Sequence, residues 1–172
     1  MRSLRFSFPV WLVAGTSAAA AVVFAAGVLA GPFAAADEGG DVRPVTDKTV
    51  RAECGACHMA FPAGMLPARS WQALMAGLDN HFGENAALDT ATARRISDYL
   101  VANAAGAGGR RNSILRGLKA GDTPLRITET PWWIREHRGE VRPEAFKDPR
   151  VGSKANCVAC HRGAAQGNFD DD

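Results

Sequence analysis

Neither acidic nor basic residues are in surplus over most of this chain, and cysteine and histidine are scarce. The 172 residues include 20 Lys and Arg and 18 Asp and Glu, but only four Cys and four His. Because Arg2 and Arg5 lie in an N-terminal segment without acidic residues, residues 37–172 hold 18 side chains of each sign. This balance excludes a nucleic-acid binder that relies on a clustered basic surplus. The length suits one compact unit or two very small ones.

Residues 1–36 have the layout of a secretory signal peptide. Met1 to Arg5 supplies the positive start, Phe6 to Ala30 is apolar and uncharged, and Ala34 to Ala36 supplies the small residues that precede a cleavage site. The apolar run is also about long enough to span a bilayer, so an uncleaved anchor is the alternative. Whether this segment is a cleaved signal peptide or an uncleaved anchor, we expect the rest of the chain to lie in the periplasm.

The exported part divides at a segment rich in Gly and Ala, residues 103–109. Gly106, Gly108 and Gly109 lie close together there and mark a boundary between two halves. The first half reads as helical, whereas the second is richer in Pro, Arg and turn signals. We therefore predict a haem domain in residues 37–105 and a second one in residues 106–172, for the reason given next.

One five-residue motif, C-x-x-C-H, occurs once in each half, and the two copies use every cysteine of the chain. C-x-x-C-H is the attachment signature of c-type haem. Two cysteines three apart on a helical turn face the same side and form thioethers with the two vinyl groups, while the adjacent histidine binds the iron. The motif residues are Cys54, Cys57 and His58, and then Cys157, Cys160 and His161. The motifs thus predict two covalently bound haems c.

Other uses of C-x-x-C explain the pattern less well. Four thiolates could bind one zinc ion, but that site needs no histidine after each pair. A redox-active pair normally follows a strand in a βαβ pattern, which this sequence lacks. A disulfide that closes so short a loop would add little stability.

Each haem iron also needs a sixth ligand or an open position. After the two motif histidines, His81 and His137 remain, one in each half. Methionine is the other common axial ligand, and Met59, Met65 and Met75 are the alternatives. Met59 adjoins a motif histidine, and Met65 lies in a proline-rich loop.

Met75 lies on the apolar face of a predicted helix with Trp71, capped by Ser70, which favours a core role. His81 extends the same face by three residues, so we expect it to point inward. Further helices are predicted from Thr46 or Asp47 into the first motif, and from Asp89 to about Ala104.

His137 lies on a short predicted helix that begins at Thr130-Pro131 and is closed by Gly139. A solvated histidine among charged residues is the alternative, but Trp132 and Trp133 would draw this helix toward a haem. Sequence proximity pairs His81 with the first motif and His137 with the second, and the crossed pairing stays open.

Three runs together resemble the dihaem cytochrome c family, often called DHC. They are CGACHMAFPAGMLPARSWQALMAGLDNHFGENAALD, TPWWIREHRGEV and SKANCVACHRGAAQGNFDDD, and they cover nearly all of the exported chain. The resemblance implies a mainly α fold, with an N-terminal class I cytochrome c-like domain and a C-terminal haem domain with little regular structure. It also implies two bis-histidine haems, His58 with His81 and His161 with His137.

The expected function is therefore a low-potential electron carrier and not an enzyme. The resemblance implies a monohaem c-type cytochrome that can bind oxygen as the electron acceptor, and a membrane b-type cytochrome as the donor. The alternatives are a peroxidase-like dihaem enzyme and a haem-based redox or gas sensor, both of which need a labile axial ligand. A modest basic cluster is a solvated face, a set of partners for haem propionates or a docking patch; it comprises Arg110, Arg111, Arg116, Lys119 and Arg126.

Overall fold

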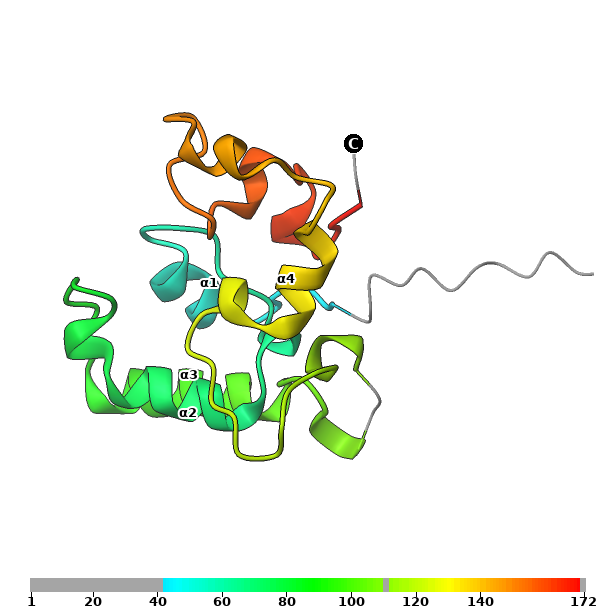
Figure 1. The fold of residues 1–172 in the computed structure, drawn as a ribbon. Helices are drawn as coiled ribbons and strands as arrows, with labels where there is room; N and C mark the ends of the chain where they lie inside the picture. The colour runs from blue at the N-terminus through cyan, green and yellow to red at the C-terminus, as the bar shows by residue number, and fades with distance from the viewer. Residues whose placement is uncertain (1–41, 110–111, 171–172) are drawn as a thin grey trace, which may run out of the picture. The chain divides into compact units, whose positions relative to one another are not determined.

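The computed structural model describes residues 42–109 and 112–170, which belong to one compact unit of residues 36–172 (Figure 1). These described residues form α-helices and 3-10 helices and no strand, which confirms the mainly α prediction. No helix among them is long and apolar enough to cross a membrane. The predicted signal peptide or anchor, and Arg110 and Arg111 of the basic cluster, lie outside the described residues.

The α-helices are short, and long stretches of 3-10 helix and turn connect them. They are α1 (Lys48–Cys54), α2 (Ala68–Ala76), α3 (Thr90–Ala102) and α4 (Pro131–His137). The 3-10 helices are η1 (Ala63–Met65), η2 (Leu78–Asn80), η3 (Ala107–Gly109), η4 (Ser113–Leu115), η5 (Ile127–Glu129), η6 (Pro143–Lys147), η7 (Cys157–Ala159) and η8 (Ala164–Gln166). After residue 105, α4 is the only α-helix in the described part.

Three of the α-helices begin at predicted capping residues. The Asp47 carboxylate accepts hydrogen bonds from the backbone N–H groups of Thr49 and Val50, at 2.8 and 3.1 Å, and Asp89 caps α3 in the same way. The Thr130 hydroxyl accepts from the Trp133 N–H at 3.2 Å. Because a cap satisfies donors that have no partner within the helix, these residues fix where the helices start.

The predicted start of α2 is wrong. The helix begins at Ala68, directly after Pro67, and Ser70 is buried inside its first turn. The Ser70 N–H already donates a helical hydrogen bond to the Pro67 carbonyl, at 2.9 Å, so Ser70 lies within the helix and is not its cap. The helix then ends at Ala76, before a Gly77 cap, and does not reach His81.

The core is continuous across the Gly- and Ala-rich segment. Helices α2 and α3 pack against one another (Figure 1). Buried residues from before and after the segment form one cluster that includes Val50, Leu66, Ile96, Leu100, Ile114, Trp132 and Trp133. The Ala105 N–H donates to the Leu66 carbonyl at 2.9 Å, and the Arg69 guanidinium donates to the carbonyls of Lys119 and Asp122. Lys119 and Asp122 are thus attached to α2 by hydrogen bonds, and the division into two haem domains stays a prediction.

Candidate functional site: two histidine pairs beside the cysteine motifs

The first motif lies where α1 ends. Cys54 is the last residue of the helix, and Cys57 and His58 lie in the turn that follows. The Nδ1 of His58 is 2.7 Å from the Met59 carbonyl oxygen. Because a carbonyl oxygen only accepts, Nδ1 carries the proton and Nε2 is free to bind a metal. Burial, aided by the negative charge of Glu53, raises the pKa of the Cys54 thiol.

The second motif forms a single helical turn. Cys157 to Ala159 is the 3-10 helix η7, and the N–H groups of Cys160 and His161 donate to the Cys157 carbonyl at 3.1 and 2.8 Å. Burial raises the pKa of the Cys157 thiol. The second motif therefore has the helical turn that places two cysteines and a histidine around one ligand, whereas in the first motif the helix supplies Cys54 and the following turn supplies Cys57 and His58.

The structure brings His81 opposite His58. Their ring centroids are 6.3 Å apart and the ring planes differ by 26°. His81 follows η2 and lies in a tight turn, in which its N–H and carbonyl pair with the carbonyl and N–H of Glu84 at 2.7 and 3.2 Å. Burial lowers the pKa of His81, and the positive charges of His58 and Arg126 lower it further. The neutral imidazole, which is the metal-binding form, is thereby favoured.

His137 lies opposite the second motif histidine, at the end of α4. The His137 and His161 ring centroids are 6.2 Å apart, with planes at 89°. The His137 Nδ1 donates to the Trp133 carbonyl at 2.8 Å, and the His137 ring stacks on the Trp133 indole, with centroids 4.1 Å apart and planes at 18°. Helix, hydrogen bond and stacking together fix this imidazole.

The two separations match a metal bound between two imidazoles. With a metal–nitrogen bond of about 2 Å, and each ring centre about 1.2 Å behind its nitrogen, the two ring centres lie about 6.4 Å apart. Both pairs, at 6.3 and 6.2 Å, are close to that value. Each pair also adjoins the two cysteines of a C-x-x-C-H motif. A c-type haem therefore fits the donor atoms of both sites.

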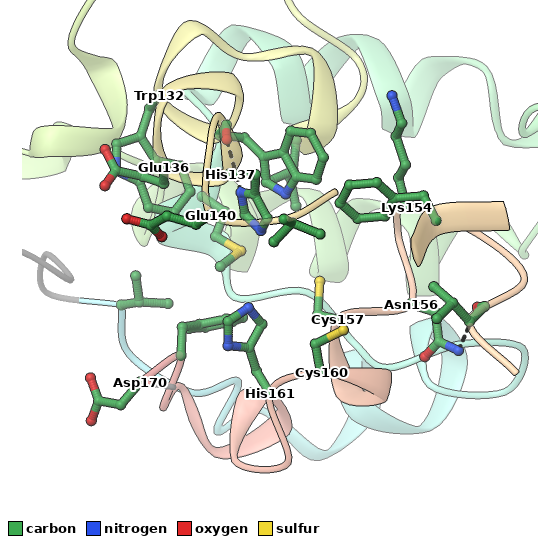
Figure 2. Close-up of a pocket in the computed structure, with 18 of the residues that line it drawn as sticks. Trp132, Glu136, His137, Glu140, Lys154, Asn156, Cys157, Cys160, His161 and Asp170 are labelled. Atoms are coloured by element: carbon green, nitrogen blue, oxygen red, sulfur yellow. Dashed lines mark hydrogen bonds between the residues drawn. The ribbon is translucent and has the colours of Figure 1, made fainter. Parts of the chain in front are cut away.

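A cavity of about 680 Å³ separates His137 from His161. Figure 2 shows the two histidines on opposite sides of this space, with Cys157 and Cys160 beside it. The volume lies within the range for ligand sites, roughly 300–1,000 Å³. Apolar walls come from both halves of the chain, namely Val42, Met65, Ile127, Trp132, Trp133, Val141, Phe146, Val151 and Phe169.

The three methionines considered as alternative ligands lie in different parts of the structure. Met65 is 2% exposed and lines the cavity of the second motif, although it is close in sequence to the first. Met75 is partly buried against the core, as predicted from its helical face. Met59 supplies the carbonyl that accepts from His58.

Sequence reasoning missed several aromatic residues around the histidines. Phe146 lies 5.6 Å from the Trp133 ring and 6.3 Å from His137, centroid to centroid, and Phe169 lies 5.8 Å from His161. Lys154 is 5.8 Å from both the Trp133 and Phe146 rings. Phe146 is an isolated aromatic residue in a charged run, and that contrast is the signal from which a pocket role could have been predicted.

Comparisons with known proteins give a family match. Residues 50–169 match the family described as dihaem cytochrome c. No curated protein matches the chain.

Solved structures similar to this chain include two from Rhodobacter sphaeroides and one from Shewanella baltica OS155. A diheme cytochrome c from R. sphaeroides is 55% identical, with a TM-score of 0.70 and coverage of 74% of this chain and 99% of that one. DHC purified from R. sphaeroides is 52% identical, with a TM-score of 0.63 and coverage of 73% and 99%. The diheme cytochrome sb-DHC from S. baltica is 41% identical, with a TM-score of 0.59 and coverage of 72% and 86%.

The family match spans both C-x-x-C-H motifs and both facing histidines. Membership implies a haem-based electron-transfer protein with two covalently bound c-type haems. The chain belongs to the dihaem cytochrome c family.

Proposed function

We propose that the chain is a periplasmic, low-potential electron carrier whose two haems each have two histidine ligands. His58 and His81 would bind the first iron, and His161 and His137 the second. The observation that supports this most directly is the pairing itself: each motif histidine faces one further histidine at the distance that two ligands of one metal require. The pairing follows sequence proximity, and the crossed arrangement is not favoured by these distances.

Each iron would be held by two histidines. A bound haem iron supplies one-electron oxidation and reduction. Paired imidazoles leave no position for oxygen or peroxide, so the side chains direct the site away from bond-making chemistry and toward electron transfer. Hydrogen bonds from His58 and His137 to backbone carbonyls hold Nδ1 protonated and orient each ring.

Two features favour the ferric state and hence a low reduction potential. Histidine in place of methionine removes the thioether ligation that raises the potential. Three acidic side chains, Glu136, Glu140 and Asp170, also line the cavity between His137 and His161, against one lysine, Lys154 (Figure 2). Glu136 is paired with Arg135 at 3.0 Å, which offsets part of this negative charge. Negative charge near the iron stabilises the more positive oxidised form.

The partners we propose are a monohaem c-type cytochrome, able to bind oxygen, as acceptor and a membrane b-type cytochrome as donor. The family resemblance is the support for both. Stopped-flow mixing of the reduced protein with a candidate acceptor tests the first. Electron transfer slower than the acceptor's own autoxidation would argue against that partner.

Optical spectroscopy of the purified holoprotein tests the ligation. We expect low-spin ferric and ferrous spectra that do not change on mixing with carbon monoxide, because an adduct can form only as slowly as a histidine dissociates. His81→Ala and His137→Ala should each open one haem per chain, seen as a high-spin component and a carbon monoxide adduct. Met65→Leu, a volume-conserving change in the second cavity, is the matched control and should open neither.

An adduct that forms on mixing in the unaltered protein would contradict the carrier proposal and favour a dihaem enzyme or a gas sensor. An adduct that forms on mixing only in Met65→Leu would instead assign the second distal position to the thioether of Met65.

A further inference from the structure

The two histidines outside the motifs, His81 and His137, are held in position by different contacts. His137 ends a helix, donates to the Trp133 carbonyl and stacks on the Trp133 ring. His81 lies in a turn, and in the described part of the chain its ring nitrogens have no hydrogen-bond partner. The backbone bonds with Glu84 hold the turn, but the ring itself is held by ring contacts, and beyond His58 that contact is with Phe82.

Phe82 has an unusual backbone conformation. Its φ is 57°, the one positive φ at a non-glycine residue in the described part of the chain. An aromatic residue in the left-handed region carries a conformational cost, so contacts of its side chain must offset that cost. The Phe82 ring lies edge-on to His81, with centroids 4.8 Å apart and planes at 60°.

Burial does not hold the Phe82 ring, because Phe82 is 44% exposed. Instead, the guanidinium carbon of Arg126 lies 3.8 Å from the ring centroid. This is a cation–π contact between the turn that carries His81 and the segment that leads into η5 and α4. Arg126 also lies 3.6 Å from the Glu129 carboxylate, which restricts the guanidinium further.

We propose that Arg126 is a positioning residue for the first haem: by stacking on Phe82 it holds the His81 turn closed, so that His81 stays on the iron. Its loss would make the first haem, and not the second, accessible to a small neutral diatomic ligand. This proposal rests on the bis-histidine ligation proposed above. It assigns to Arg126 a role distinct from a solvated basic face or a docking patch.

The test uses the full-length holoprotein, reduced and placed under saturating carbon monoxide. At saturation, the rate of adduct formation reports how often the distal histidine dissociates. An exposed cation–π contact changes an equilibrium by about two- to fivefold, so Arg126→Gln should form the adduct about two- to fivefold faster. Phe82→Leu should have the same effect, and Arg126→Lys should restore part of the slow rate.

Arg135→Gln is the matched control. Arg135 is also an exposed arginine paired with a neighbouring glutamate, at 3.0 Å, and it lies two residues before the other distal histidine, but it stacks on no ring in the described part. Its adduct rate should equal that of the unaltered protein. Far-ultraviolet circular dichroism and haem content of all variants should be unchanged.

Double variants identify the haem that opens. In a His81→Ala background, Arg126→Gln should change nothing, because the first haem is already open. In a His137→Ala background, in which the second haem reacts on mixing, Arg126→Gln should speed the slow adduct of the first haem by the same factor. The proposal would be overturned if Arg126→Gln and Phe82→Leu formed the adduct no faster than the unaltered protein. It would also be overturned if the effect of Arg126→Gln persisted in His81→Ala. An unaltered protein that binds carbon monoxide at once would instead overturn the bis-histidine ligation.

Discussion

At the scale of single residues, two glycines allow the cost of a left-handed backbone to be measured apart from the cost of a steric clash. Gly167, which ends η8 after the second motif, has φ +83°, and a Cβ there would lie 2.5 Å from the Val42 carbonyl oxygen. Gly139, which follows α4, has φ +89°, but a Cβ would meet nothing within 4 Å. Both positions need the left-handed conformation, and only the first also needs the missing side chain.

We therefore expect Gly139→Ala to cost about 1 kcal/mol of unfolding free energy, from the conformation alone. Gly167→Ala should cost about 1–3 kcal/mol more, because the methyl group must displace backbone. Chemical denaturation of the two holoproteins measures the difference. Equal losses would mean that the chain around Val42 moves aside without cost.

His81 shows what the residue pattern can and cannot predict. The helical spacing from Trp71 placed His81 on an inward face, and the structure does bring it opposite His58. The reason was wrong, because the helix ends at Ala76 and His81 is positioned by a turn. Sequence periodicity has no information about a turn whose geometry depends on Phe82 and on Arg126, 44 residues later along the chain.

At the scale of elements, Asp47 couples α1 to α3. Its carboxylate caps α1 and also pairs with Arg95 of α3, at 2.9 Å. The hydrogen bond from the Val50 N–H, with those from Arg95 and Thr49, lowers the pKa of Asp47. A lowered folded-state pKa means that the charge stabilises the fold above the ordinary value of about 3.9, and that this stability is lost as the pH falls through the folded value.

We expect Asp47→Asn to lower the unfolding free energy slightly at pH 7, and the difference from the unaltered protein to shrink below about pH 4. Asparagine caps a helix as well as aspartate does, so the change isolates the charge. Because Arg95 is 61% exposed, added salt should also reduce the difference. The measurement is thermal unfolding across pH, and Asp47→Asn combined with Arg95→Gln is the control. A difference that persists at pH 2 would show that the charge is not its cause.

The helices themselves were largely predictable because their caps are local. Asp47, Asp89 and Thr130 begin three helices as the sequence indicated, since a capping side chain acts within three residues. Ser70 failed as a cap because Pro67 starts the helix earlier. The attachment of Lys119 and Asp122 to α2 was not predictable, because the Arg69 hydrogen bonds that hold them join residues 50 or more apart.

At the scale of the whole molecule, the site of the second haem is also part of the shared core. Met65, Ile127, Trp132 and Trp133 belong to the buried cluster and line the cavity between His137 and His161. A space of about 680 Å³ among these side chains has the size of a ligand site, so a haem bound there would fill part of the core. The helices, of 7, 9, 13 and 7 residues, are also too short to be stable alone.

Folding should therefore depend on haem attachment, and more on the second haem than on the first. A chain with all four cysteines changed to serine should lose most of its far-ultraviolet circular dichroism and the protection of its amides from hydrogen exchange. Cys157→Ser with Cys160→Ser should approach that state, because Trp132 and Trp133 lose the group that fills their cavity. Cys54→Ser with Cys57→Ser, the matched pair at the other motif, should keep more of its protection. Native-like protection in the four-serine chain would show that the polypeptide core folds without haem. An equal loss of protection in the two double variants would show that folding depends no more on the second haem than on the first.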